Sequence, residues 1–424
     1  MTAPHDSGVS PRDPGLQGGR DHPEGGGAPE SQGPLYLDPN LLVVFSITLM
    51  AVMGVSSITP VFPSVVEALD ITPEAVGLLV SVYALPGIIF TPVMGILADR
   101  LGRKRVLVPA LVLFALAGSA CALARDFQLL LILRFFQGLG GASLGSLTAT
   151  LIGDFYQGQQ RTAAMGYKAS VLSLGSALYP SLGGALAVLG WYVPFGLPIL
   201  GLVVAGAVLF LLDTPPPSER GGFLRYLDDA VGGMRQMKVL GLYLATLLSF
   251  AVLYGAYMTF IPLFLSERFG SSAPAIGPVM TVGSLATALT ASRLGRLSGR
   301  LGRESLLTWA FGLFAVSFVI IPWMPGHWWV VLAVGLFGVA QGFNYPVVLS
   351  LLAGIAPEEQ RAVFMSVNGM VIRIGQAVGP LLMGAVFAVG GMDMVFYAAA
   401  GICAVVFLLL PFLLGRGERA SETS

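Results

Sequence analysis

The sequence predicts an all-α integral membrane protein whose twelve transmembrane helices form two six-helix halves. Hydrophobic residues make up 55% of the 424 residues, charged residues make up 11%, and the mean hydropathy is +0.80, which excludes an ordinary soluble domain. Twelve apolar runs are long enough to cross a bilayer core of about 30 Å, which takes about 20 residues per helix. A charged segment of the first half also returns in the second half.

The apolar runs divide the chain into halves with a polar segment between them. Residues 1–38 are rich in Gly and Pro and are expected to be a disordered cytoplasmic tail. The six-helix halves cover 39–213 and 238–415, the linker covers 214–237 with a short amphipathic helix expected near Phe223 to Met234, and 416–424 form a second cytoplasmic tail. The expected spans lie near 40–64, 73–97, 106–124, 127–153, 163–188, 192–212, 239–264, 274–295, 305–324, 328–353, 363–388 and 393–415.

The repeated segment reads GILADRLGRKRVL at 95–107 and GRLSGRLGRESLL at 295–307. Gly95 and Gly102 suit a tight turn, and the charged positions between and after them suit a loop in water. Seven positions recur at an offset of 200 residues, namely Gly95, Leu97, Arg100, Leu101, Gly102, Arg103 and Leu107. Equal charge places both loops on one side of the membrane, so each half should contain an even number of spans.

Basic residues set the expected orientation, because Lys and Arg gather on the cytoplasmic side. With the N-terminus inside, sixteen basic residues fall on inner segments and only Arg125 and Arg268 on outer loops. Both termini are therefore expected in the cytoplasm.

The 95–107 segment resembles the loop between the second and third helices of the major facilitator superfamily of transporters. The matching residues are Gly95, Asp99, Arg100, Gly102, Arg103 and Lys104. The resemblance implies alternating access by two parallel halves, with Asp99 holding the inward face closed by contact with the start of the eleventh helix. Asp154, at the inner end of the fourth helix, is expected to pair with Arg103. The second copy has Gly299 in place of the acid.

Three cations lie inside predicted spans, where each costs roughly 2.5–3.5 kcal/mol on insertion scales. Arg134 opens RFFQGLGGA, which resembles the family's fourth-helix signature and implies a role for Arg134 and Gln137 in proton coupling; the alternative is an arginine that snorkels outward. Lys168 either lines the cavity or snorkels inward. Arg373 lies twelve residues past Arg361, about 18 Å into the helix, and is expected to line the cavity.

Two glycine- and proline-rich segments resemble the signature of drug and proton antiporters. GSALYPSLGG contributes Gly175, Pro180, Gly183 and Gly184, with Tyr179 where a glycine is usual, and GQAVGPLLMG contributes Gly375, Gly379, Pro380 and Gly384. Glycines at this spacing allow close helix contact, and proline permits a bend. The alternative is generic packing of small residues.

The expected cavity is aromatic and polar without being acidic. No Asp or Glu lies near the middle of a span, and Glu67, Asp70 and Glu74 at the outer end are either coupling groups or solvated carboxylates. Aromatic rings and neutral amides bind apolar molecules with little demand on shape. The candidate lining residues are Tyr83, Lys168, Tyr179, Tyr254, Tyr257, Gln341, Asn344, Asn368 and Gln376.

Together these features predict a secondary transporter of a bacterial cytoplasmic membrane that exports lipophilic drugs and draws on the proton gradient. The expected substrate is neutral or anionic, the protein is expected to be monomeric, and no cofactor, metal or nucleic acid is implied. A narrower exporter or facilitator of sugars, amino acids or siderophores is the alternative, and a non-transporting receptor or scaffold is a remote one. GASLG at Gly141 to Gly145 fits a hydrolase pattern, but no histidine is placed to serve it, and no nucleotide-binding motif occurs, so the chain is not expected to be an enzyme.

Overall fold

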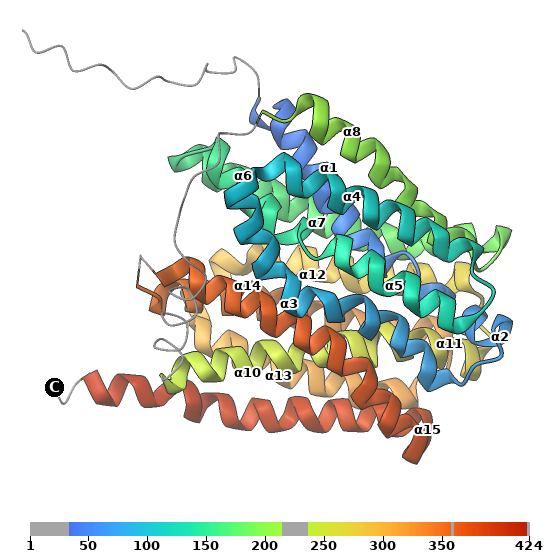
Figure 1. Cartoon of the computed structure of the whole chain (residues 1–424). Coiled ribbons are helices and arrows are strands. Elements are labelled where there is room, and N and C mark those ends of the chain that lie inside the picture. Colours follow the sequence, from blue (N-terminus) through green and yellow to red (C-terminus); the bar gives the residue numbers. More distant parts are fainter. Residues whose placement is uncertain (1–33, 214–235, 358–359, 422–424) are drawn as a thin grey trace, which may run out of the picture.

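The computed structural model describes residues 34–213, 236–357 and 360–421 and is helical throughout these ranges (Figure 1). The predictions for most of the N-terminal tail, for the linker and its amphipathic helix, and for the last three residues lie outside the described residues. The predicted halves appear in Figure 1 as an upper and a lower group of helices that run in roughly the same direction.

The first half contains six membrane-crossing units. They are α1 (Pro39–Ser56) with η2 (Thr59–Val61) and α2 (Phe62–Ala68); η3 (Pro73–Gly77) with α3 (Leu78–Leu101); α4 (Arg103–Ala120) with η4 (Cys121–Leu123); α5 (Phe127–Gly141) with α6 (Leu144–Phe155); α7 (Gly158–Leu186) with η5 (Ala187–Leu189); and η6 (Val193–Ile199) with α8 (Leu200–Leu211). A short η1 (Leu35–Leu37) precedes them. Asp38 caps α1 by accepting from the Asn40 amide at 2.8 Å, and Pro39 at the first helical position fits the same start.

The second half repeats this order. It contains α10 (Met237–Val252) with the π-helix η7 (Leu253–Phe260) and α11 (Ile261–Phe269); α12 (Ala273–Leu301); α13 (Arg303–Ile320) with η8 (Ile321–Trp323); η9 (His327–Trp329) with α14 (Val330–Ile355); and α15 (Arg361–Ser421).

The last helix accounts for two spans. Eleven helical segments within the described residues are long and apolar enough to cross a membrane, and the last of them, Val363–Gly415, has 53 residues. At 1.5 Å per residue this segment is about 80 Å long, more than twice the bilayer core. Gly391 breaks it with φ 72° and ψ −169°. The chain therefore crosses twelve times, as predicted, and the helix continues to Ser421, past the predicted end at 415.

The charged segments are more helical than the sequence suggests. α3 continues to Leu101 and α4 begins at Arg103, so Gly102, with φ 97°, makes the turn alone. Gly302, with φ 76°, does the same between α12 and α13. The prediction that Gly95 helps the chain turn is therefore wrong, because Gly95 lies inside α3. Helices can extend beyond the bilayer here because their polar last turns lie in water.

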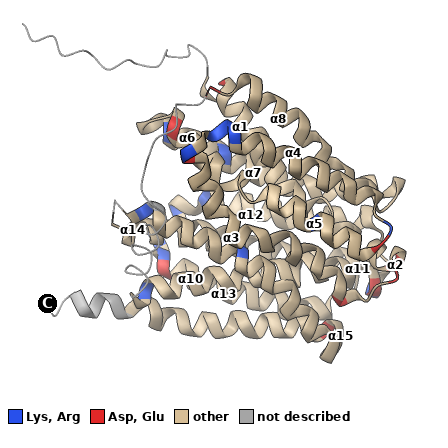
Figure 2. Ribbon diagram, viewed as in Figure 1, with Lys and Arg blue, Asp and Glu red and all other residues tan. Residues whose placement is uncertain are grey.

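Six spans separate the 95–107 segment from the 295–307 segment, so both lie at the same end of the bundle. We call it the basic end, and we call the end with α2 and α11 the far end. In Figure 2 most of the Lys and Arg residues gather at the basic end, beside α6 and α14. The two halves contact each other mainly through two pairs, α7 with α12 and α3 with α15. The 200-residue repeat exchanges these pairs, because α12 is the copy of α3 and the first part of α15 is the copy of α7.

Candidate functional site

At the far end the two halves touch closely through α7 and α12. A Cβ at Gly277 would lie 2.5 Å from the Pro180 carbonyl oxygen, and a Cβ at Gly184 would clash with the Ala273 carbonyl oxygen. Thr281 Oγ1 donates to the Ala177 carbonyl at 2.7 Å and lies 2.7 Å from Ser181 Oγ. Only glycine permits these backbone contacts, so the two helices are fitted to each other at this end.

The second pair, α3 and α15, meets at the same end through η3, the turn that leads into α3. A Cβ at Gly77 would lie 3.0 Å from Pro380 Cβ, and a Cβ at Gly384 would lie 3.4 Å from Glu74. The other signature glycines pack inside their own half: Gly175 against Leu49, Gly183 against Ser57, and Gly375 and Gly379 against α10. The glycine-rich segments therefore provide close helix packing, but α7 and α15 pack against α12 and α3 rather than against each other.

Toward the basic end the same four helices separate. A Cβ at Gly95 on α3, Gly166 on α7, Gly295 on α12 or Gly369 on α15 would meet no heavy atom within 4 Å. The hydrogen bonds between Thr281 and Ala177 or Ser181, and between Thr59 and Met258 Sδ, join the two halves and lie in the far half of the bundle. The fitted contacts between the halves are thus concentrated at the far end, and we call this arrangement closed at the far end and open at the basic end.

The charged residues of the basic end pair within their own half. Arg103 bonds Asp99 at 2.5 Å and Asp154 at 3.1 Å, so the predicted Arg103–Asp154 pair is present. Lys104 donates to the Leu209 carbonyl at 3.2 Å. Asp99 makes no hydrogen bond or ion pair with the described part of α15 in this open arrangement. Its gating role stays a prediction about a state with a closed basic end.

An aromatic cluster lies near the middle of the bundle, where α10, η7 and α14 meet. Phe250 stacks on Tyr254 with ring centroids 6.2 Å apart, and its edge meets Tyr345 at 5.6 Å. Tyr254 and Tyr345 are half-buried, so part of each ring remains accessible. Tyr83 of α3 is buried, with 3% of its surface exposed, and approaches the cluster from the first half.

Arg373 brings a positive charge to this aromatic cluster. Its side chain is half-buried, Nη1 donates to Gln376 Oε1 at 3.1 Å, and its stem lies against Gly87 of α3 in the other half. A Cβ at Gly87 would lie 3.1 Å from Arg373 Cδ and Nε, so the glycine leaves room for the guanidinium. No carboxylate among the described residues pairs with Arg373. The centre of the bundle therefore presents a cation and aromatic faces to whatever enters from the basic end.

Several predicted lining residues belong to the packed interior instead. Tyr257 is 4% exposed, stacks on Phe337 at 4.2 Å and donates to the Met280 carbonyl. Tyr179 is buried beside Gly175, and Asn368 is buried and accepts from Thr246 at 3.0 Å. The prediction that these three line the cavity is wrong for this arrangement. Tyr257 and Asn368 contact neighbouring helices of the same half, which the sequence does not reveal.

The remaining polar candidates differ in burial. Gln376 is buried and bonds Arg373, whereas Lys168 is half-buried on α7 without an ion pair to a described residue. The Gln341 Oε1 and Asn344 Oδ1 atoms are buried and have no hydrogen-bond partner within the described ranges. Both lie on α14, so this helix offers two free acceptors.

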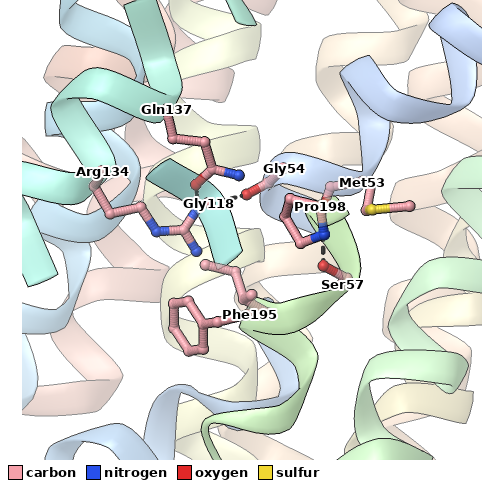
Figure 3. A pocket seen from close by; sticks show the side chains of 9 residues that line it. Met53, Gly54, Ser57, Gly118, Arg134, Gln137, Phe195 and Pro198 are labelled. Carbon is pink, nitrogen blue, oxygen red and sulfur yellow. Dashed lines mark hydrogen bonds between the residues drawn. The ribbon is translucent and has the colours of Figure 1, made fainter. Parts of the chain in front are cut away.

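Arg134 lies deep in the first half, with 1% of its surface exposed. Nη1 donates to the Gly54 carbonyl and to Gln137 Oε1, both at 2.8 Å, as Figure 3 shows. The guanidinium also lies over the Phe195 ring at 4.8 Å. The alternative in which Arg134 snorkels to the outer face is therefore wrong.

The sequence comparisons agree with this architecture. The sequence model of the Major Facilitator Superfamily matches residues 44–326 and 242–424, and the chain belongs to this family of transporters. The "Bacillibactin exporter" of Bacillus subtilis (strain 168) is 24% identical over 397 residues, covering 90% of this chain and 98% of that protein. The "Quinolone resistance protein NorA" of Staphylococcus aureus (strain Mu50 / ATCC 700699) is 24% identical over 381 residues, covering 88% and 97%.

Solved structures share the fold at low identity. The nucleoside transporter NupG aligns with a TM-score of 0.72 at 15% identity, covering 90% of this chain and 99% of that chain. A bacterial homolog of the human lysosomal transporter Spinster aligns with a TM-score of 0.70 at 16% identity, covering 92% and 98%. The protein is thus a multi-pass membrane transporter of the two-half fold that the sequence predicts.

Three features of the site escaped prediction from sequence. Phe250 packs against Tyr254 and Tyr345, Gly87 leaves room for Arg373, and Thr281 forms a hydrogen bond to the first half at the far end. Gly87 and Thr281 lie on α3 and α12, which the 200-residue repeat relates to each other. The signal in the sequence is the set of small residues along these two helices, which includes both positions.

Proposed function

We propose that this transporter exports lipophilic anions and neutral lipophilic compounds across a bacterial cytoplasmic membrane, as a monomer driven by the proton gradient. The basic end is assigned to the cytoplasm because Lys and Arg favour that side. The described arrangement is then the inward-facing one, ready to accept substrate from the cytoplasm. Rocking of the two halves exposes the centre to the other side.

The half-buried Arg373, which has no carboxylate partner among the described residues, is the observation that carries the substrate class. A guanidinium stays charged at all physiological pH and presents donors that match a carboxylate or sulfonate. Phe250, Tyr254 and Tyr345 provide apolar faces beside it. A dication is disfavoured here, since it would meet a like charge in a medium of low dielectric constant.

The relatives support export and leave two candidate substrate ranges. The name of the Staphylococcus relative refers to quinolone resistance, which favours a drug transporter. The name of the Bacillus relative refers to export of bacillibactin, which favours a single metabolite as the second candidate. An open aromatic site makes few directional contacts, and this favours the broader range.

For the proton, the half-buried Glu74 at the interface with α15 is the coupling group that we infer. Its backbone and Cβ lie about 3.4 Å from the position of a Cβ on Gly384, so its protonation changes the charge at a contact between the halves. Glu67 and Asp70 are exposed and fit solvated carboxylates. Arg134, Gln137 and Arg373 remain the other coupling candidates.

Inverted membrane vesicles with an acidic lumen test this function. We expect uptake of an anionic anilinonaphthalene sulfonate dye that collapses when a protonophore is added. Arg373→Gln should slow anionic dye uptake by about 10- to 100-fold, since a hydrogen bond to a charged group is worth about 1.5–3 kcal/mol. Uptake of neutral N-phenylnaphthylamine should change far less.

Arg296→Gln is the matched control, because Arg296 is exposed on α12 and has no ion pair with a described residue. It should leave uptake of both dyes near the wild-type rate. Dye uptake that ignores the pH gradient would indicate a facilitator. Equal loss of both dyes in Arg373→Gln would contradict the proposed role of its charge.

A further inference from the structure

One side of α12 is exposed and changes from apolar to basic along the helix. Thr287 donates to the Gly338 carbonyl of α14 at 3.0 Å, which identifies the side of α12 that packs inside the second half. Leu285 and Leu289 lie two residues to either side of Thr287, about 200° round the helix from it, and both are exposed. The two leucines therefore lie on the side of α12 that is turned away from α14.

Three arginines continue this side toward the basic end. Arg293, Arg296 and Arg300 follow Leu289 at helical spacing, so they share its side of α12. All three side chains are exposed, and the row ends in the last turn of the helix at Leu301. At 1.5 Å per residue the row is about 10 Å long. We call it the arginine row.

The repeat-related helix α3 shows which way this side faces. Gly87 of α3 lies against Arg373, at the centre of the bundle. Leu85 and Ile89, the copies of the two leucines, lie two residues to either side of Gly87 and are exposed on the opposite side of α3. They point away from the centre, so the apolar side of each of these related helices faces the surrounding lipid.

Further along, α3 stays apolar where α12 becomes basic. Val93 and Ile96 are the copies of Arg293 and Arg296, and Val93 is exposed on the side that faces lipid. The first half therefore presents hydrocarbon at the depth where the second half presents charge. A cation at the edge of the hydrocarbon is unfavourable unless it reaches the headgroups or meets an anion.

The protein supplies little to offset this charge. No member of the arginine row forms an ion pair with a residue in the ranges that the structure describes. The acids nearby at the basic end are engaged elsewhere, since Asp99 and Asp154 bond Arg103 and Glu304 bonds Lys238. Like charges three or four residues apart on a helix repel each other. An anion from outside the chain therefore stabilises the arginine row.

We propose that the arginine row binds the headgroup of an anionic glycerophospholipid in the leaflet at the basic end. The planar guanidinium groups donate to the phosphate oxygens, whose geometry they match. The acyl chains lie along Leu285 and Leu289, and the long side chain of Arg293 keeps its charge at headgroup level. This site lies on the outer surface of the bundle, apart from the aromatic cluster around Arg373, and does not depend on the proposed substrate.

Native mass spectrometry of the purified full-length protein tests this site. The probes are phosphatidylglycerol and phosphatidylcholine with the same acyl chains, and the wild-type protein should bind phosphatidylglycerol more tightly. Arg293→Val combined with Arg296→Ile gives α12 the residues of α3. It should weaken phosphatidylglycerol binding by about 10- to 30-fold, since each basic residue near an anionic lipid contributes about fivefold. Phosphatidylcholine binding should not change.

The matched control removes the same charge from other helices of the basic end. Arg105→Gln combined with Arg361→Gln neutralises exposed arginines of α4 and α15 and should leave phosphatidylglycerol binding near the wild-type affinity. Arg296→Gln alone keeps two arginines of the row, so the site stays occupied in membranes rich in anionic lipid. Equal loss in both double variants would assign the binding to diffuse charge and overturn the proposal. Equal binding of the two lipids by the wild-type protein would overturn it as well.

A photoactivatable phosphatidylglycerol keeps the proposal testable if the α12 variant fails to fold. With the reactive group in its acyl chain, it should label residues 285–300 of wild-type α12 in preference to residues 85–100 of α3. Equal labelling of the two helices would contradict a specific site. Glycerol 3-phosphate at the same concentration should displace no label, because it lacks the acyl chains; displacement would assign the arginine row to a soluble phosphate instead.

Discussion

The two ends of the bundle are built from the same four helices, yet they differ in how those helices meet. At the far end, α7 and α12 approach until only glycine fits, as at Gly184 and Gly277. At the basic end, Gly166 and Gly295 on the same two helices meet no neighbouring atom within 4 Å. In this structure the fitted surface exists at the far end, as expected for two halves that pivot as rigid bodies near the centre.

The repeat relates the two helix contacts that close the far end. α7 with α12 and α3 with α15 are exchanged by the 200-residue offset, so both pairs close the same end together. Charge takes part differently at the two ends. The far end closes through backbone contact and neutral hydrogen bonds, with Glu74 as a carboxylate at its contact with α15, whereas the basic end carries Asp99, Arg103 and Asp154. We expect steric changes to act most strongly on the far end, and charge changes on the basic end and at Glu74.

Filling the glycine contact of the far end should have the largest effect. In Gly277→Leu, the added side chain overlaps the Pro180 carbonyl, and overpacking of this kind costs about 1–3 kcal/mol. The equilibrium between the two arrangements should therefore shift by about 10- to 100-fold toward an open far end. Dye uptake in inverted vesicles should fall accordingly, with normal protein levels.

Gly401→Leu is the control for this substitution. Gly401 is an exposed helical glycine on the second part of α15, and a Cβ there meets no atom within 4 Å. Dye uptake by the Gly401→Leu variant should proceed at the wild-type rate. Wild-type uptake in Gly277→Leu would show that the α7–α12 contact is not required for closure.

Removing the acid of the basic end should have the next largest effect. Asp99→Asn loses its charge-assisted bond to Arg103 and the expected contact with the start of α15 in the alternate state. We expect uptake about 10-fold slower, within the range of hydrogen bonds to charged groups. Asp70→Asn is the control, since Asp70 is exposed at the far end and asparagine tolerates its positive φ of 48°. A wild-type rate in Asp99→Asn at normal protein levels would exclude the gating role.

The smallest effect should come from the neutral hydrogen bonds of the far end. Thr281→Val keeps the shape of the side chain but removes the hydroxyl that bonds Ala177 O and Ser181 Oγ. Such bonds contribute about 0.5–1.5 kcal/mol, so the far end should open about 2- to 10-fold more often. The readout is the rate at which a membrane-impermeant thiol reagent labels a cysteine introduced at Thr59, which lies beside Met258 of the other half. An unchanged labelling rate would show that the glycine contact alone sets closure.

The features that could be predicted are those that the order of residues along the chain encodes directly. Apolar run length predicts the twelve spans, the repeat places the charged segments at one end, and the family resemblance implies the Arg103–Asp154 pair. The antiporter-type glycines were identified, but the sequence did not indicate which of them contact the other half. That assignment depends on helix rotation, and a helix surrounded by protein and lipid shows little hydrophobic asymmetry.

The same limit explains the errors at the site. Tyr254 and Tyr257 are three residues apart and equally aromatic, yet one joins the central cluster and the other stacks on Phe337 inside the half. The π-helix η7 contains both, and its wider turn alters which residues share a face. The local sequence does not indicate this wider turn. The spacing of an ordinary α-helix therefore does not predict which of the two tyrosines faces the central cluster.

The most direct test of the rocking motion measures both ends of one helix pair in reconstituted liposomes. Spin labels at Val188 and Ser272 report the far end, and labels at Gln160 and Gly299 report the basic end; Cys121 and Cys403 are buried and should not react. Relative to wild type, Gly277→Leu should lengthen the far-end distance and shorten the basic-end distance. Lengthening at the far end with no shortening at the basic end would contradict two rigid halves that pivot around a central site.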